Sequence, residues 1–271
     1  MNFFNFAYVT GTHLSDEGKS VAKEISFADK DAKFKCIVHG GNALNGNNPE
    51  KISVKLLGME YERFIGAVEN KILLPVQGET DGWRNERFKG QLAVNIMTDK
   101  VWDEAISFTD SYKGLKRKGD SPYYYMDFKN AKVRFIILCS YFYEYDEKYE
   151  LFEKFKGFKA KQLKWLIDDA LNLPKGYTAV IFSHSVPKSR FETGKDPFIY
   201  NSWSTEQNLM ILQQAQRNMG IKIAAWISGG YNKEEALNIG GINFITTKSL
   251  TFYNCSLTEN KLLLNDLSVE Y

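Results

Sequence analysis

The chain has 271 residues, of which 44% are apolar and 25% charged, and its formal net charge is +2. This composition is typical of a globular protein, and the length is sufficient for one large domain. The net charge is too small to indicate binding to nucleic acid or to an anionic membrane surface. There is no apolar run long enough to span a membrane and no signal peptide, so we expect a cytoplasmic location.

The chain contains three cysteines, Cys36, Cys139 and Cys255, which are far apart in the sequence. Cys36 and Cys139 lie in apolar, strand-like runs, where a free cysteine behaves as a small hydrophobic residue. The number and spacing therefore indicate neither a disulfide framework nor a zinc site made of cysteines.

The first half of the chain alternates predicted strands and helices. Aromatic and β-branched residues predict a strand at 3–10, and Ser15 is a good N-cap for the helix that follows it. A second strand is predicted at 34–38. Pro49 suits the first turn of a helix that runs to about residue 69, and a third strand begins at Ile72. This alternation predicts a parallel sheet.

The second half continues the alternation and then changes. Residues 84–130 are predicted to be an irregular insertion, with a solvated basic turn at 113–120. Strands are predicted at 133–140, 178–183 and 223–228. Helices are predicted at 160–171 and from the capping box at Ser204 to Gly220. From about residue 240 the pattern predicts an antiparallel meander with strands at 242–247, 250–254 and 261–267. The whole chain is predicted to be a single α/β domain built on two packed sheets.

Five predicted strands end in short polar or glycine-rich turns. They are Gly11-Thr12-His13, residues 42–46, Gly78-Glu79-Thr80-Asp81, His184 and residues 229–232. In order and spacing these blocks resemble the calcineurin-like metallophosphoesterase superfamily. The resemblance covers most of the chain. It implies a four-layer αββα sandwich of two mixed β-sheets flanked by helices.

The family hydrolyses phosphate esters with two divalent ions held by Asp, His and Asn side chains. Carrying its first blocks over, the resemblance places Gly11 where the family has its first Asp, while His13 is retained. Asn42 stands where the bridging Asp is expected, and Glu79 where an Asn is expected. Thr80 occupies the position of the catalytic His, so a two-metal centre cannot be assembled by the same residues.

The last blocks show the same mixture of retained and replaced residues. His184 matches the lone His of the family, whereas Gly230 and Asn232 stand at the two final His positions. The resemblance therefore implies a vestigial site made of His13, Asn42, Glu79, His184 and Asn232. Within it, Asn42, Glu79 and His184 map to one half and form a candidate site for a single divalent ion, Mn, Zn, Mg or Fe.

Other residues near these blocks are expected to support the loops. Asp81 and Asn45 are predicted to fix the loops by hydrogen bonds rather than to bind metal. His39 is interpreted as structural. Tyr231 is a candidate to fill space left by the replaced histidines, and Trp83 and Trp203 are expected in the core.

The favoured hypothesis is a pseudoenzyme that acts as a binding or scaffold module, with protein partners. The resemblance allows a place in a larger assembly such as a phage tail, and so in a virion. The alternative is a metal-dependent phosphodiesterase or phosphatase with a remodelled, single-metal site. A third hypothesis is phosphate binding without cleavage at the glycine-rich turns, such as Gly40-Gly41.

Overall fold

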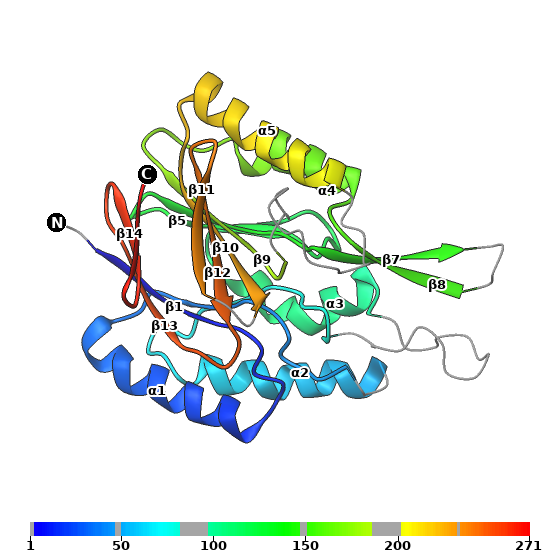
Figure 1. Cartoon of the computed structure of the whole chain (residues 1–271). Coiled ribbons are helices and arrows are strands. Elements are labelled where there is room, and N and C mark those ends of the chain that lie inside the picture. The colour runs from blue at the N-terminus through cyan, green and yellow to red at the C-terminus, as the bar shows by residue number, and fades with distance from the viewer. Residues whose placement is uncertain (1–2, 47–49, 82–96, 147–150, 186–201, 232–233) are drawn as a thin grey trace.

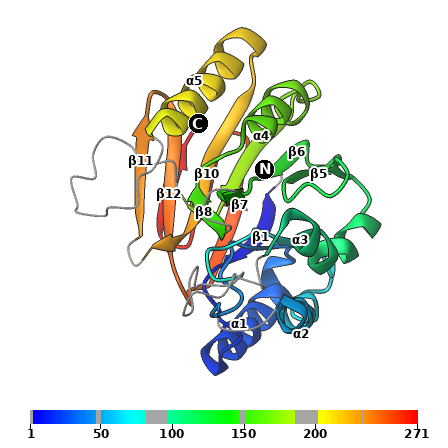
Figure 2. The same ribbon diagram turned by 90° about the vertical axis from the view of Figure 1, so that its right-hand side faces the viewer.

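The computed structural model describes residues 3–46, 50–81, 97–146, 151–185, 202–231 and 234–271. Two mixed β-sheets pack face to face, with helices on both outer faces (Figures 1 and 2). This is the four-layer αββα arrangement expected from the sequence.

The first sheet has six strands and is centred on β1 (Phe4–Val9). On one side β1 pairs in parallel with β2 (Ile37–His39), which pairs in parallel with β3 (Leu73–Pro75). On the other side three antiparallel strands follow one another: β13 (Tyr253–Leu257), β14 (Lys261–Leu264) and β15 (Leu267–Glu270). The short strands β2 and β3 are entirely buried, as parallel strands covered by helices usually are.

The second sheet has seven strands, with four parallel strands at its centre. These are β6 (Val133–Ile137), β9 (Thr178–Ser183), β10 (Lys222–Tyr231) and β12 (Ile242–Lys248). The antiparallel strands β5 (Tyr124–Phe128) and β4 (Leu115–Arg117) extend one side, and β11 (Glu235–Ile239) closes the other. A separate two-stranded hairpin joins β7 (Tyr141–Asp146) to β8 (Leu151–Lys156).

The helices form the outer layers of the sandwich. The helices α1 (Asp16–Ala32) and α2 (Glu50–Ile65) cover the six-stranded sheet, and α3 (Asp99–Ile106), followed by the 3₁₀ turn Ser107–Ser111, lies beside α2. The helices α4 (Ala160–Trp165) and α5 (Ser202–Met219) cover the seven-stranded sheet. Ser15 caps α1 as predicted, since its Oγ accepts a hydrogen bond of 3.0 Å from the Gly18 N–H.

Aromatic side chains hold the two sheets together. Phe6 of β1 lies edge to face against Phe135 of β6, with ring centroids 4.8 Å apart, and Phe4 packs on both Phe128 and Phe135. All of these rings except Phe128 are buried. Such geometry adds to the free energy gained from burying the rings themselves. The sandwich is thus fastened through the first strand of the chain.

Two regions differ from the sequence-based expectation. The segment from about residue 240 is not one meander, because β12 pairs in parallel with β10 in the second sheet and only β13 to β15 form the meander, in the first sheet. Of the segment expected to be irregular, residues 82–96 lie outside the described residues. The remainder contains α3, β4 and β5, so it is more regular than expected.

The three cysteines are free thiols buried in the core, in agreement with their sequence context. Burial raises the pKa of the Cys139 thiol to about 12, which keeps it protonated and unreactive. Among the described helices, none combines the length and the apolar character that crossing a membrane requires.

Arg134 of β6 fastens the end of the α4 layer to the second sheet. Its Nε and Nη2 donate to the Asp127 carboxylate at 2.7 and 2.8 Å. Its Nη1 donates to the carbonyl oxygens of Asp169, Ala170 and Asn172, where the π-helical turn Leu166–Ala170 ends. The guanidinium thus satisfies carbonyl groups that a helix end leaves without a partner.

We predict that Arg134→Met lowers the free energy of unfolding by about 3–5 kcal/mol, because the half-buried Asp127 carboxylate loses its partner. Urea denaturation measures this loss. The matched control is Lys164→Met, which removes an exposed pair with Asp168 and should change stability by less than about 1 kcal/mol. Equal losses in the two variants would contradict the role given to Arg134.

Candidate functional site

The carboxyl ends of β1, β2, β3, β9 and β10 meet at one edge of the sandwich. Backbone hydrogen bonds join the loops that follow them: Gly11 N–H to the Gly41 oxygen at 2.9 Å and His13 N–H to the Asn42 oxygen at 3.1 Å. We call this region the strand-end junction, which comprises residues 10–14, 40–46, 78–81, 183–185, 228–229 and 249–250. It contains most of the residues that the resemblance predicts for the site.

Asp81 lies at the centre of the strand-end junction and is fully buried. Its Oδ2 accepts hydrogen bonds from the backbone N–H groups of Gly78 at 2.7 Å and Asn42 at 3.1 Å, and its Oδ1 accepts from Leu44 N–H at 3.0 Å. Burial raises the pKa of Asp81 to about 6, although these N–H groups act in the opposite direction. The carboxylate therefore ties together the loops after β2 and β3.

His13 and His184 each donate a hydrogen bond from a ring N–H group to a backbone carbonyl oxygen. His184 Nδ1 lies 2.6 Å from the Gly40 oxygen, and His13 Nδ1 lies 3.0 Å from the Leu44 oxygen. A carbonyl oxygen can only accept, so the proton of each ring sits on Nδ1. This is the arrangement that orients metal-binding histidines, with Nε2 as the ligand atom.

The replaced positions at the third strand end make contacts within the loops. Thr80 is buried, its N–H donates to Asn42 Oδ1 at 2.9 Å, and its hydroxyl donates to the Leu44 oxygen. Glu79 is half-buried and Asn45 is exposed. The structure thus brings Asn42 and Thr80 into direct contact, at the positions where the resemblance expects a bridging ligand and a catalytic histidine.

Gly11 stands where the resemblance expects the first aspartate. Its φ is +68°, a left-handed conformation that strains any residue with a side chain. A Cβ atom there would lie 2.5 Å from Ser249 Oγ, in the turn between β12 and β13. That turn is fixed by a hydrogen bond of 2.9 Å from Leu250 N–H to the Thr10 oxygen. No carboxylate can be placed at this position without moving the turn.

Other glycines allow similarly close approach across the strand-end junction. A Cβ atom on Gly41 would lie 2.6 Å from Gly78 Cα and 2.7 Å from His184 Nδ1. A Cβ atom on Gly229 would overlap Thr10 Oγ1. Backbone therefore fills space between the strand ends. The N–H of Gly40 donates to the Val9 oxygen at 2.7 Å and is not available to bind a phosphate.

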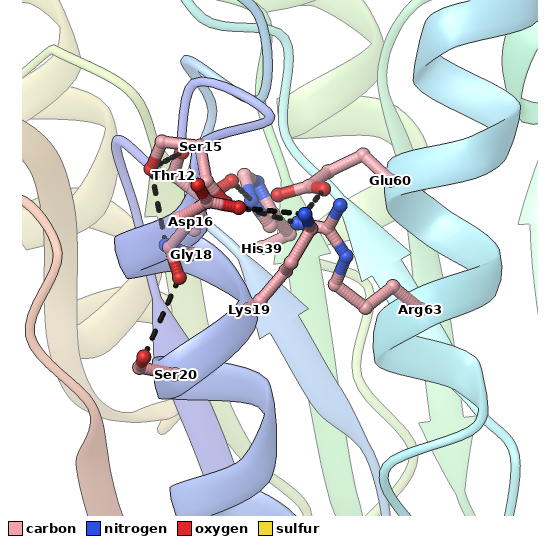
Figure 3. Close-up of polar contacts among 9 residues, drawn as sticks. All are labelled: Thr12, Ser15, Asp16, Gly18, Lys19, Ser20, His39, Glu60 and Arg63. Atoms are coloured by element: carbon pink, nitrogen blue, oxygen red, sulfur yellow. Dashed lines mark hydrogen bonds and ion pairs between the residues drawn. The ribbon is translucent and has the colours of Figure 1, made fainter.

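His39 is completely buried behind the first loop, in agreement with its interpretation as structural. Its Nε2 lies 3.0 Å from Thr12 Oγ1, and burial lowers its pKa to about 3. Figure 3 shows it facing Glu60 of α2, whose carboxylate pairs with Arg63 at 2.6 Å. Burial also raises the pKa of Glu60. This polar cluster connects α2 to the loop that carries His13.

Several predicted residues cannot be placed. Asn232 and Trp83 lie outside the described residues, as do the side chains of Tyr231 and Trp203. Conversely, Ser249 and Thr10 belong to the strand-end junction but were not predicted. Ser249 follows a strand of the other sheet, and no local pattern indicates its contact with Gly11. Within the described part of the chain, no three His, Cys, Asp or Glu side chains are grouped to hold a metal ion.

A scan against protein-family models finds no match, and no curated protein sequence matches this chain. Solved structures do match. A dimetal phosphatase from Danio rerio aligns over 99% of both chains, with a TM-score of 0.67 and 15% identity. A purple acid phosphatase from yellow lupin seeds aligns over 99% of this chain and 52% of its own length, with a TM-score of 0.60 and 11% identity.

The chain has the calcineurin-like metallophosphoesterase fold. A third structure with this fold is GAP50, named as the anchor in the inner membrane complex of Plasmodium, with a TM-score of 0.52 and 12% identity over 100% of this chain and 89% of that one. At these identities the matches establish the fold alone.

We predict that Asp81 makes stability fall as pH rises. Its folded-state pKa of about 6 exceeds the ordinary value of 3.8, so the folded state binds the proton more tightly. The contribution is fully present below pH 3.8 and is lost as pH rises through about 6, by about 3 kcal/mol. Urea unfolding of wild type and Asp81→Asn at several pH values measures it, and the difference between them should shrink with rising pH.

The control for this experiment is His39→Gln, because His39 acts with the opposite sign. Its pKa is lowered from 6.5 to about 3, so its contribution is present above pH 6.5 and is lost as pH falls toward 3. The wild-type advantage over His39→Gln should therefore grow with rising pH. A pH-independent difference between wild type and Asp81→Asn would contradict the prediction.

Gly11→Ala tests the packing of the first strand end. We expect a loss of about 1–2 kcal/mol from the positive φ and about 1–3 kcal/mol more from overlap with Ser249. Gly119→Ala is the matched control, since Gly119 has φ +57° and nothing within 4 Å of its Cβ position. Adding Ser249→Gly should recover only the second part of the loss. Equal losses of unfolding free energy at Gly11 and Gly119 would contradict the prediction, because they would show that the turn at Ser249 moves to accommodate the added Cβ atom.

Proposed function

We propose that this chain is a binding or scaffold module on a phosphoesterase fold, without two-metal hydrolysis. The observation that carries the proposal is the conformation of Gly11. At the position expected to supply the first carboxylate, the backbone is left-handed and Ser249 fills the space of a side chain. The first metal ligand is therefore lost in a way that a neighbouring side chain cannot easily replace.

The remaining residues do not fit a two-metal centre either. Asn42 carries no charge and its Oδ1 already accepts the Thr80 N–H, so it is a poor bridge between two cations. Asp81, the buried carboxylate nearby, is held by three backbone N–H groups at hydrogen-bond distance. Because its oxygen atoms accept hydrogen bonds from the loops, we assign Asp81 a role in holding the strand-end junction together and not in binding metal.

A scaffold role has a parallel among structures with this fold, because GAP50 is named as an anchor. A rigid sandwich whose strand-end loops are held by internal hydrogen bonds presents a preformed surface, which lowers the entropy lost on binding. We propose a protein partner for this surface. A cytoplasmic location stays a prediction from the sequence, and a place in a virion stays a prediction from the family resemblance.

A second function, a hydrolase with a single metal ion, is favoured by the histidines. His13 and His184 both donate Nδ1–H to backbone carbonyls, the orientation that prepares Nε2 to ligate. Asn42, Glu79 and His184 would hold the ion. Such an ion would polarise a phosphoryl oxygen as a Lewis acid.

One experiment separates these two functions. Purified protein is analysed for bound metal, and hydrolysis of bis-p-nitrophenyl phosphate is measured with added Mn²⁺. The scaffold proposal predicts less than stoichiometric metal and no turnover above that of a denatured sample. The same assay on His184→Ala should be indistinguishable from wild type, because no chemistry depends on the ring.

Stoichiometric metal together with turnover that His184→Ala abolishes would overturn the proposal in favour of the single-metal enzyme. Thermal melting of His184→Ala is required as a control, since the buried ring bonds Gly40 and its loss alone destabilises the junction. Glu79→Ala provides a second test with less structural damage, because Glu79 is one of the three proposed ligands and is only half-buried.

A further inference from the structure

The amino ends of the strands form the edge of the sandwich opposite the strand-end junction. Phe4 at the start of β1 packs on Phe128 at the end of β5, with ring centroids 4.7 Å apart, so this edge is continuous across both sheets. Lys222 at the start of β10 also reaches Asn260 between β13 and β14. The start of β1 and the C-terminal end of the chain lie on this side in Figure 1.

Exposed lysines occur at nearly every loop of this edge. They end α1, precede β2, β3, β4 and β9, form the turn between β5 and β6, and begin β10 and β14. The ten residues are Lys30, Lys33, Lys35, Lys71, Lys113, Lys129, Lys132, Lys175, Lys222 and Lys261. We call them the basic edge.

The exposed acidic residues in the same loops, strand ends and last helical turns are Asp31, Glu69, Asp110, Asp168, Asp169, Glu259 and Glu270. Of these, Glu69 pairs with Lys33 itself, whereas Asp110 pairs with Arg117 and Asp168 with Lys164. The surplus of lysines here exceeds the net charge of +2 of the whole chain, so the rest of the protein is net negative. The fold therefore separates charge that is nearly balanced in the sequence. A local surplus of this size attracts polyanions even when the total charge is small.

Two exposed aromatic rings accompany the basic edge. Phe3, just before β1, is 55% exposed, and Phe27, in the last turns of α1, is 71% exposed. Lys30 Nζ lies 5.4 Å from the centroid of the Phe27 ring. Large apolar rings held in water among lysines gain free energy by entering an interface that is apolar below and anionic at its surface.

We propose that the basic edge docks this protein on an anionic phospholipid membrane, with Phe3 and Phe27 entering the headgroup region. The lysines would contribute through charge alone, at about 1 kcal/mol for each one near the surface. The strand-end junction would then face away from the bilayer. This proposal is independent of whether the junction binds a partner or hydrolyses a phosphate ester.

A bilayer fits these observations better than a nucleic acid does. The basic edge consists of lysines on separate loops across both sheets, and not of a groove that could follow a nucleic-acid backbone. Lysine acts on phosphate as a point charge, whereas arginine gives the paired hydrogen bonds that favour specific recognition of phosphodiesters. Phe3 precedes β1 and Phe27 lies in the last turns of α1, and both rings are exposed, so both are available to enter a headgroup layer.

The test is sedimentation of the full chain with vesicles of phosphatidylcholine, with and without phosphatidylserine. We expect binding only when phosphatidylserine is present, and weaker binding as salt rises. The triple variant Lys30→Glu, Lys35→Glu and Lys175→Glu should bind at least about tenfold more weakly. Phe27→Ser should bind more weakly in the same assay without a change in its salt dependence.

The matched control is Lys118→Glu, Lys161→Glu and Lys248→Glu, which changes the net charge equally at exposed positions away from the basic edge. It should bind within about twofold of wild type. Circular dichroism and melting curves confirm that both triple variants fold. Failure to bind phosphatidylserine vesicles, or equal weakening in both triple variants, would overturn the proposal. Binding of duplex DNA or RNA in place of vesicles would assign the basic edge to nucleic acid.

Discussion

The buried carboxylate of Asp81 is the interaction on which the strand-end junction depends. The loops after β2 and β3 run through the interior without a regular partner, and their N–H groups must be satisfied there. Asp81 accepts from Asn42 and Leu44 of one loop and Gly78 of the other, so a single side chain joins both. Burial of the charge costs free energy, which the hydrogen bonds offset in part. The positions of His13 and Asn42 follow from this arrangement.

Three glycines, Gly11, Gly41 and Gly78, determine which side chains the strand-end junction has room for. Where a ligand-bearing side chain is expected, Gly11 lets the turn at Ser249 approach the backbone of β1. At Gly41 and Gly78 two loops touch each other and the ring of His184. These approaches require the absence of a Cβ atom, so at this edge backbone takes space that side chains would otherwise fill. The loops are held together by backbone contacts and by the Asp81 carboxylate.

The sequence supports the architecture more fully than the site. Alternating strands and helices, and local signals such as the Ser15 cap, predict the order of layers, and the resemblance supplies the sandwich. The sequence predicts a single meander from about residue 240, whereas β12 pairs in parallel with β10, because an apolar pattern does not reveal whether a strand's neighbours are parallel. The contact between Gly11 and Ser249 is likewise invisible, since it depends on the chain crossing between sheets after Lys248. Local patterns cannot encode contacts that only the final packing creates.

The basic edge is the feature of this protein that composition alone could not predict, because it depends on the fold. A net charge of +2 gives no reason to expect an anionic surface as partner, and that argument is sound for a charge spread evenly. In an α/β sandwich, however, every helix-to-strand loop along the parallel strands reaches the same edge. Lysines that are scattered in the sequence, such as Lys35, Lys71 and Lys175, therefore gather in space. The opposite edge receives the strand-to-helix loops that form the strand-end junction. A membrane at the basic edge would leave the strand-end junction exposed to the other side, so one surface can attach the protein while the other recruits a partner.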